Sequence, residues 1–289
     1  MGKKGLFVGL LTLDFLYLTA DYPSSNQKIV AADYALAAGG PATNAAVAFS
    51  YLGNQAKLLS ILGNHPVTQL IRTDLESHHV TIRDLDPTHV EPPSVSSIIV
   101  TQNTGERAVI SINAVKYQGH KDSVSSDIFY GVDIVLMDGH QIEVGQKIGE
   151  LAKLNNIPVV VDGGSWKPGF DKLLPFVDYA VCSANFYPPG CQNSPEAIDY
   201  LLSVGIPHIA ITNGEKPIQY MFEGKTGWIE VPKVKVVDTL GAGDVFHGAF
   251  CHYILQDSFP DALQAATKVA SRSCQFFGTR QWMKMKDEV

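Results

Sequence analysis

One short stretch combines small residues with a carboxylate at the predicted start of a helix. It follows a β-branched run at residues 236–237, which predicts a strand, and it precedes an apolar periodic segment, which predicts a helix. The first amides of a helix lack partners within it and lie at the positive end of its dipole, so such a turn can bind an anion. Asp244 follows this turn, where a carboxylate could take a proton from a hydroxyl group that attacks phosphorus. The small residues are Gly241, Ala242 and Gly243.

The same residues also fit a purely structural role. A Gly-Ala-Gly run before a helix commonly forms a tight turn, and an aspartate in the first helical turn favours the dipole without catalysis. The longer motif favours function, because residues 238–244 followed by Gly-Ala-Phe at 248–250 resemble the C-terminal motif of the ribokinase-like (PfkB) carbohydrate kinases. The resemblance implies that Asp244 is the catalytic base and that the preceding amides hold the transferring phosphate. The implied ATP contacts in this motif are Thr239, Gly241 and Gly243.

The composition is typical of a protein with a large core and an acidic surface. The chain has 289 residues, of which 45% are hydrophobic, and this suffices for one α/β domain over residues 1–289. The formal net charge of -7 and the lack of Lys/Arg-rich blocks disfavour nucleic acid as a partner. The four cysteines form no Cys-x-x-Cys pair, so they predict neither a zinc ribbon nor a redox site.

The N-terminus imitates a targeting signal over a short distance. Two lysines precede the apolar run 5–11, but Asp14 follows closely and no small-x-small cleavage site is present. Leu6 stands where a myristoylation signal has Ser or Thr. No apolar run approaches membrane-spanning length, so we expect a cytoplasmic protein with no membrane partner.

The first predicted strand leads to an expected sugar contact. Residues 6–11 form a continuous apolar run, as in a strand covered on both faces of a parallel sheet, and ligands of such sheets collect at the carboxyl edge. Asp14 lies just beyond this run, where an aspartate alone is usually a turn residue or a helix cap. By resemblance it grips sugar hydroxyls, and its two oxygens suit a vicinal pair.

A glycine turn then opens an alanine-rich predicted helix that ends near residues 52–53. It resembles the N-terminal motif of the family, whose second glycine and asparagine contact the sugar. Gly40 and Asn44 match these positions, with Gly39 beside them. Ketohexokinase-like members, which the chain resembles most, carry a substrate-binding asparagine at the position of Pro41. Proline brings neither an amide side chain nor an N–H group, which weighs against fructose as substrate.

Two parts of the chain are predicted to form a small sheet outside the main fold. Residues 22–36 lack helical periodicity, and the β-rich runs 94–100 and 107–112 are joined by an Asn-Thr-Gly-Glu hairpin signal. The resemblance implies a β lid over the sugar site, formed from about 15–37 and 93–117.

The predicted lid also suggests an arginine contact and a dimer. Arg107 matches an arginine that lies near the sugar or the phosphates in related kinases, although a hairpin arginine is more often a solvated surface charge. An isolated ribbon has open edges and exposed faces, and many family members dimerise through the lid. We therefore expect a homodimer that buries Ile98, Val100, Val109 or their neighbours.

Strands and helices alternate at short spacing from residue 133 onward, which indicates βαβ units and a mostly parallel sheet. With the resemblance, the expected fold is a ribokinase-like three-layer αβα sandwich with a small β lid. Asp162 and Lys167 follow one of these strands, and by resemblance they are secondary candidates for the phosphate side. The expected strands are residues 134–137, 159–161, 179–182 and 208–212.

The family pattern for magnesium is incomplete in this chain. Many members carry Asn-x-x-Glu after a late strand, and the glutamate organises Mg²⁺ through water. Asn185 is present, but Pro188 replaces the glutamate. Either Glu196 or another acid compensates, or the nucleotide itself holds the ion, because magnesium usually keeps several waters and few protein ligands.

The remaining ATP contacts come from resemblance. The turn after the strand 208–212 is similar to the Thr-x-Gly-Glu turn that borders ATP, which implies contacts from Thr212, Gly214 and Glu215. Cys274, in the predicted last helix 262–277, matches an adenine-side cysteine of ketohexokinase-like members. A small buried apolar residue is an equally good interpretation of this cysteine.

Together these features predict an ATP- and Mg²⁺-dependent kinase that phosphorylates a hydroxyl group of a small sugar, with a ketose among the options. A nucleoside kinase of the same family stays open, as does a catalytically silent sugar sensor, because Pro188 removes an acid. A nicotinamide dehydrogenase is disfavoured, since Phe246 stands where the third glycine of Gly-x-Gly-x-x-Gly belongs. A Walker-A run is absent from the sequence.

Overall fold

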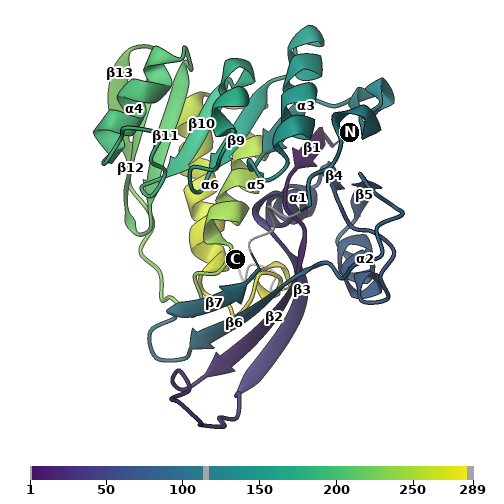
Figure 1. Cartoon of the computed structure of the whole chain (residues 1–289). Helices are drawn as coiled ribbons and strands as arrows, with labels where there is room; N and C mark the ends of the chain where they lie inside the picture. The colour runs from purple at the N-terminus through teal and green to yellow at the C-terminus, as the bar shows by residue number, and fades with distance from the viewer. Residues whose placement is uncertain (1, 113–116, 285–289) are drawn as a thin grey trace.

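The computed structural model describes residues 2–112 and 117–284, and its largest element is a nine-stranded sheet (Figure 1). The strand order is β13-β12-β11-β10-β9-β8-β1-β4-β5. The strands from β11 to β5 are parallel, whereas β12 and β13 are antiparallel. The bounds are β1 (Lys4–Val8), β4 (Gln55–Ser60), β5 (Val80–Asp84), β8 (Ile134–Met137), β9 (Val159–Gly163), β10 (Tyr179–Ser183), β11 (His208–Asn213), β12 (Lys216–Phe222) and β13 (Lys225–Ile229).

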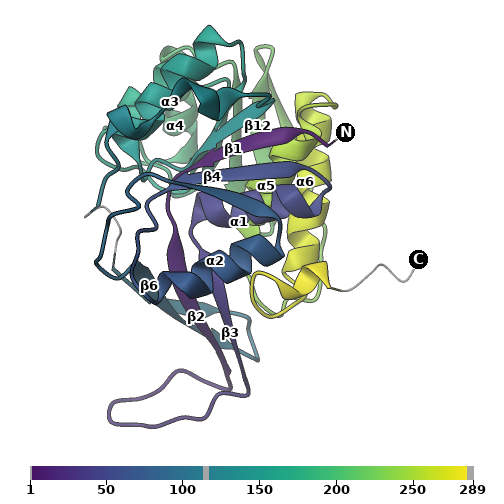
Figure 2. The same cartoon turned by 90° about the vertical axis from the view of Figure 1, so that its right-hand side faces the viewer.

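Helices cover both faces of this sheet, as Figures 1 and 2 show. Alternate residues of the buried strands feed two separate cores, so that Phe7 packs on the side of α1, α2, α5 and α6, whereas Leu6 and Val8 pack on the side of α3 and α4. The predicted three-layer αβα sandwich is thereby confirmed. The bounds are α1 (Pro41–Tyr51), α2 (Thr68–Ser77), α3 (Ile142–Leu154), α4 (Ser194–Ser203), α5 (Ala242–Tyr253) and α6 (Phe259–Ser273). No helix in the described ranges is long and apolar enough to cross a membrane.

A second sheet of four strands extends beyond the carboxyl end of β1 (Figure 1). Its order is β3-β2-β6-β7, with bounds β2 (Thr12–Thr19), β3 (Asp33–Gly39), β6 (Ser94–Thr101) and β7 (Arg107–Ser111). Leu16, Ile98 and Val100 on one face form a small core with Phe277, which follows α6. This small sheet corresponds to the predicted lid, although residues 113–116 of the expected segment lie outside the described residues.

Three details of the sequence interpretation are wrong. The first strand ends at Val8 rather than residue 11, because Gly9 lies against the Asp138 carboxylate and Leu10 donates to it instead of extending the ladder. Asp14 therefore lies within β2 and not in a turn after the first strand. Of residues 22–36, only those from Asp33 onward join a strand.

A further correction concerns the approach to α5. Residues 236–237 form no strand, because the amides of Val237 and Asp238 donate to the carbonyl oxygen of Cys274 at 2.8 and 3.2 Å. The segment before the Gly-Ala-Gly turn is thus held by the C-terminal end of α6, a helix that begins and ends about three residues earlier than predicted.

Candidate active site

The first turn of α5 is made of small residues. Gly241 precedes the helix with a φ of 69°, and a side chain there would press against Thr279. Among the described residues no side chain caps this helix, and Gly243 is exposed. Because the first amides of a helix need acceptors from outside it, the turn formed with Ala242 suits a bound anion.

Close packing of α1 against α5 brings Asn44 to Asp244. A side chain at Gly248 would collide with the carbonyl group of Ala45, so only glycine allows the two helices to approach this closely. Nδ2 of Asn44 donates to Oδ2 of Asp244 at 2.8 Å. The structure therefore joins a residue of the N-terminal motif directly to the predicted base.

The surroundings of Asp244 make it a weak acid. Burial raises the pKa of Asp244 to about 6, and the nearby Asp162 carboxylate adds to the rise. The hydrogen bond from Asn44 and the charge of His247 act in the opposite direction, and Asp138 adds a smaller rise. A carboxylate that titrates near neutrality is well suited to accept a proton during catalysis.

His247 is buried on α5, and both of its ring nitrogens face oxygen atoms. Nδ1 lies 2.7 Å from the carbonyl oxygen of Gly243 and 3.5 Å from Oδ2 of Asp162, while Nε2 lies 3.0 Å from the carbonyl oxygen of Val181. Carbonyl oxygens only accept, so both contacts are hydrogen bonds only when both nitrogens carry hydrogen. His247 is therefore enclosed by these three oxygen atoms, and its contact with Asp162 engages this secondary candidate for the phosphate side.

Asp14 faces the junction of β3 and α1. Its Oδ1 accepts a hydrogen bond from Oγ1 of Thr12 at 2.7 Å, and a side chain at Gly39 would collide with the carboxylate. Gly40 has a φ of 102°, and a side chain there would meet the carbonyl group of Leu10. The two glycines let the chain turn into α1 directly beside Asp14. Burial raises the pKa of Asp14, and the hydrogen bond from Thr12 opposes this rise.

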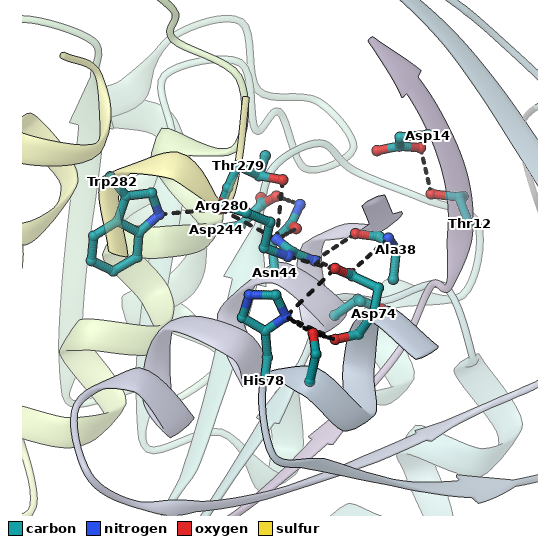
Figure 3. Close-up of polar contacts among 12 residues, drawn as sticks. Thr12, Asp14, Ala38, Asn44, Asp74, His78, Asp244, Thr279, Arg280 and Trp282 are labelled. Atoms are coloured by element: carbon teal, nitrogen blue, oxygen red, sulfur yellow. Dashed lines mark hydrogen bonds and ion pairs between the residues drawn. The ribbon is translucent and has the colours of Figure 1, made fainter. Parts of the chain in front are cut away.

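Arg280 is a site residue that the sequence motifs did not indicate (Figure 3). Its Nη1 donates to Oδ1 of Asn44 at 2.9 Å, and its Nη2 lies 3.1 Å from Oδ2 of Asp74 on α2. The guanidinium group thus contacts the same asparagine that holds Asp244. No local signal marks Arg280 in the sequence, because its partners lie on α1 and α2, more than 200 positions away.

Asp138 is a second residue that was missed, although it directly follows the buried strand β8. Its Oδ2 accepts from the amides of Leu10 at 2.8 Å and Ala42 at 3.2 Å, and its Oδ1 lies 3.1 Å from Nδ1 of His140. Although burial opposes this, His140, the Lys167 ammonium and these amides hold the pKa of Asp138 at about 2. The rule that ligand-side residues follow parallel strands could have found it.

The small sheet contacts the α5 motif through Arg107. Nη1 of this exposed residue donates to Oγ1 of Thr239 at 2.7 Å, and the hairpin turn at Gly105 lies against Val236 and Val237. Arg107 therefore reaches the segment that leads into the turn at residues 241–243.

Comparison of this chain with known protein families identifies the family to which it belongs. The model of the pfkB family carbohydrate kinases matches residues 3–285. The chain belongs to this family. A ribokinase of Lactococcus lactis is 23% identical, with 98% of this chain and 94% of the relative covered, and a deoxyribokinase of Salmonella typhi is 24% identical, with 94% and 93% covered. A ribokinase of Arabidopsis thaliana, solved with ribose and ATP, superposes with a TM-score of 0.76 at 20% identity, over 99% of this chain and all of that one.

In this kinase fold, the expected ATP contacts lie at the ends of neighbouring strands. Thr212 is near the end of β11 and pairs in register with Ser183 of β10, and exposed Asn185 follows β10. Gly214, with a φ of 58°, and Glu215 form the exposed turn into β12. Cys274 is half-buried at the end of α6, where its carbonyl oxygen holds the segment before Thr239.

The structure also shows what the candidate acids and bases around the kinase site contact. Glu196 accepts hydrogen bonds from the amide of Gln192 at 2.7 Å and the side chain of Asn193 at 2.8 Å, so it stabilises the start of α4. Nζ of Lys167 donates to the carbonyl oxygens of Asp138 at 3.1 Å and Ser165 at 3.2 Å. No group of three or more His, Cys, Asp or Glu side chains in the described part of the chain could hold a metal ion.

Proposed function

We propose that this protein transfers the γ-phosphoryl group of ATP to a hydroxyl group of a small sugar. The observation that carries the proposal is Asp244, oriented by Asn44 beside an uncapped helix start and with a pKa of about 6. Asp244 takes the hydroxyl proton, the sugar oxygen forms a bond to the γ-phosphorus, and the bond from that phosphorus to the β–γ bridging oxygen breaks to release ADP. The amides of residues 241–243 stabilise the charge on the transferred group.

The sugar lies between the small sheet and α1 in this proposal. Asp14 accepts hydrogen bonds from two sugar hydroxyls, and Gly39 and Gly40 bring the backbone at the start of α1 close to this carboxylate. Asn44 lies between this position and Asp244, so the accepting hydroxyl is held next to its base. Arg107 and Thr239 border the phosphate side.

ATP binds along the carboxyl ends of β10 and β11 in the proposal, with Asn185, Thr212, Gly214, Glu215 and Cys274 as its border. Mg²⁺ fits this site only as an ion held largely by phosphate oxygens and water, because the described residues offer no acidic cluster and Glu196 caps α4. When bound, the ion neutralises phosphate charge. The chain itself contributes the base, the orienting amides and the sugar contacts.

An assay of ADP production over a panel of substrates tests this function. Ribose, deoxyribose, fructose and several nucleosides are each offered with MgATP, and the Asp244→Asn variant serves as the blank. Turnover with a sugar that the variant loses supports the proposal, whereas turnover with nucleosides alone shows a nucleoside kinase. Sugar binding in calorimetry without ADP production by the unmodified protein contradicts catalysis and identifies a sugar sensor.

We also infer that two subunits pair through the outer face of the small sheet. Ile98 and Val100, which the sequence suggested as interface residues, are buried against Leu16 and Phe277 within one chain and cannot serve. The opposite face supports the inference, because Tyr34 is 67% exposed and Ile110 is 72% exposed.

A charged substitution on this outer face tests whether two subunits pair through it. Ile110→Lys should yield monomers in light scattering at micromolar concentration, because a lysine is costly to bury in an apolar interface. The exposed Val30→Lys change in the loop between β2 and β3 serves as the control. Unmodified protein that is monomeric at this concentration contradicts the proposed pairing.

A further inference from the structure

Arg280 lies in the segment after α6, and its guanidinium group is saturated with protein acceptors. The residue is only 9% exposed. Nε and Nη2 lie 3.3 and 3.1 Å from Oδ2 of Asp74, and Nη2 also donates to the carbonyl oxygen of Ala38 at 2.7 Å. Nη1 donates to Oδ1 of Asn44 at 2.9 Å and to Oγ1 of Thr279 at 3.0 Å. These contacts account for the five donors of the group, so none is left for a substrate.

The side-chain amide of Asn44 links Arg280 to Asp244, the proposed base. Oδ1 of Asn44 accepts from Arg280, so its Nδ2 faces the other way and donates to Oδ2 of Asp244 at 2.8 Å (Figure 3). An amide turned by 180° would place its oxygen against the Asp244 carboxylate and its NH₂ group against the guanidinium. Both contacts would then be repulsive. The cation therefore selects the orientation in which Asn44 donates to Asp244.

We propose that Arg280 is a positioning residue of phosphoryl transfer, which fixes the Asn44 amide toward Asp244 while Asp74 holds the guanidinium group in place. This inference rests on the proposed role of Asp244 as the base. Arg280 also contacts β3 through Ala38, so the same cation ties the edge of the small sheet to α1. Movement of β3 relative to α1 would strain contacts that orient the base.

Two variants separate positioning from simple structural support. Arg280→Lys keeps the charge, but a lysine ammonium lacks the planar fork that reaches Asp74, Asn44 and Ala38 together. The double variant Arg280→Met with Asp74→Asn removes both buried charges, which avoids leaving a carboxylate buried without its partner. Each variant should lower kcat about tenfold with little change in the KM for ATP. The acid limb of the pH profile should move to higher pH, because the hydrogen bond from Asn44 favours ionised Asp244.

The decisive kinetic measurement repeats the substitution in an Asn44→Ser background. If Arg280 acts through Asn44, then Arg280→Lys should lower kcat in the unmodified background and cause no further loss in the Asn44→Ser protein. An equal loss in both backgrounds would overturn the proposal and leave Arg280 a structural residue. Arg72→Met is the matched control, since Arg72 also pairs with one carboxylate, Asp84, at 3.7 Å, and its loss should leave kcat unchanged.

A measurement without substrate keeps the inference distinct from the proposed function. In protein labelled with ¹⁵N-asparagine, the side-chain NH₂ signals of Asn44 are identified by their loss in Asn44→Ser. They should exchange slowly with water in the unmodified protein and at least tenfold faster in Arg280→Lys, as for an amide that has lost a buried hydrogen bond. Unchanged Asn44 signals in the lysine variant would refute the positioning role, even for a protein with no activity toward the substrate panel.

Discussion

The N-terminal ends of α1 and α5 have similar backbone geometry, but their first amides have different hydrogen-bond partners. Both α1 and α5 begin after a glycine with positive φ, 102° at Gly40 and 69° at Gly241, and neither has a side-chain N-cap. At α1, Pro41 has no N–H group and the amide of Ala42 donates to Asp138, so the protein itself supplies the anion. At α5 the described residues provide no capping side chain and the amide of Ala242 reaches only the carbonyl oxygen of Thr239, at 3.3 Å, so this start suits an anion from outside.

The pKa values of the carboxylates near these two helix starts, Asp138 and Asp244, are shifted in opposite directions. Asp138 accepts hydrogen bonds from several donors and lies beside His140, so its pKa falls to about 2. Burial and the nearby carboxylate of Asp162 raise the pKa of Asp244 to about 6, and its single hydrogen bond from Asn44 only partly opposes this rise. Pairs of acids with separated pKa values commonly divide structural and reactive roles. Asp138 is thereby suited to hold the fold together, and Asp244 to exchange a proton.

We expect the largest effect on catalysis from a substitution of Asp244, the carboxylate with the raised pKa. Asp244→Asn should lower kcat by roughly 10²–10⁴, the usual range for the loss of a general base, while ATP affinity and thermal stability change little. Steady-state kinetics with a coupled ADP assay measures this. The exposed Asp257→Asn change, just after the same helix, is the control. Near-normal turnover in Asp244→Asn would show that Asp244 is not the general base and that its role does not differ from that of Asp138.

The sugar contact should show the next largest effect. Asp14→Ala loses hydrogen bonds between a carboxylate and sugar hydroxyls, each of which contributes about 1.5–3 kcal/mol. Calorimetry should therefore show sugar affinity weakened by roughly 10- to 100-fold for each hydrogen bond lost, and ATP affinity nearly unchanged. Asp33→Ala, an exposed aspartate on β3 of the same small sheet, is the matched control. Equal sugar affinity in both variants would place Asp14 outside the site.

A substitution of Asp138, the carboxylate with the lowered pKa, should change the stability of the fold rather than the catalytic rate. The pKa of Asp138 is lowered from 3.8 to about 2 in the folded state, so its stabilising effect is complete above pH 4 and is lost as the pH falls toward 2. Asp138→Asn should lower the free energy of unfolding by about 2 kcal/mol at pH 7 and by less at pH 3. Urea unfolding at both pH values measures this difference. A loss that does not shrink at low pH would show that the ionised carboxylate is not the cause.

The α5 start could be predicted from sequence because its chemistry is contiguous. Residues 239–244 supply the turn, the amides and the candidate base within one stretch, so the resemblance of this motif to the C-terminal motif of the family indicates the arrangement. The alternation of apolar strands and helices likewise predicted the parallel sheet, and the family resemblance implied its three layers. The β character of 94–100 and 107–112 was visible in their composition, as β6 and β7 confirm.

The rest of the site depends on contacts between distant segments. Arg280 meets Asn44 only after α1, α2 and the segment beyond α6 have packed, and no periodicity encodes that meeting. His247 looks like an apolar-face residue of α5 until the carbonyl group of Val181 and the carboxylate of Asp162 surround it. The end of β1 was misplaced for the same reason, because the amide of Leu10 donates to Asp138, which lies 128 residues later in the chain.

The smallest expected effect is the most specific test of how Asp244 is tuned. The groups that act on its pKa are Asn44 from α1, Asp138 just after β8, Asp162 from β9 and His247 from its own helix. Asp162→Asn removes a negative charge that raises the pKa of Asp244, so ionised Asp244 should persist to lower pH. The acid limb of kcat/KM, expected near pH 6, should then move downward by less than about one unit.

The sign of this shift decides whether the electrostatic account is right. His247→Gln should move the limb in the opposite direction, since it removes a positive charge that favours ionised Asp244. Asp171→Asn, an exposed change in the connection between β9 and β10, should leave the limb in place. If Asp162→Asn and His247→Gln shift the limb in the same direction, the two groups act on Asp244 through altered packing and not through their charges.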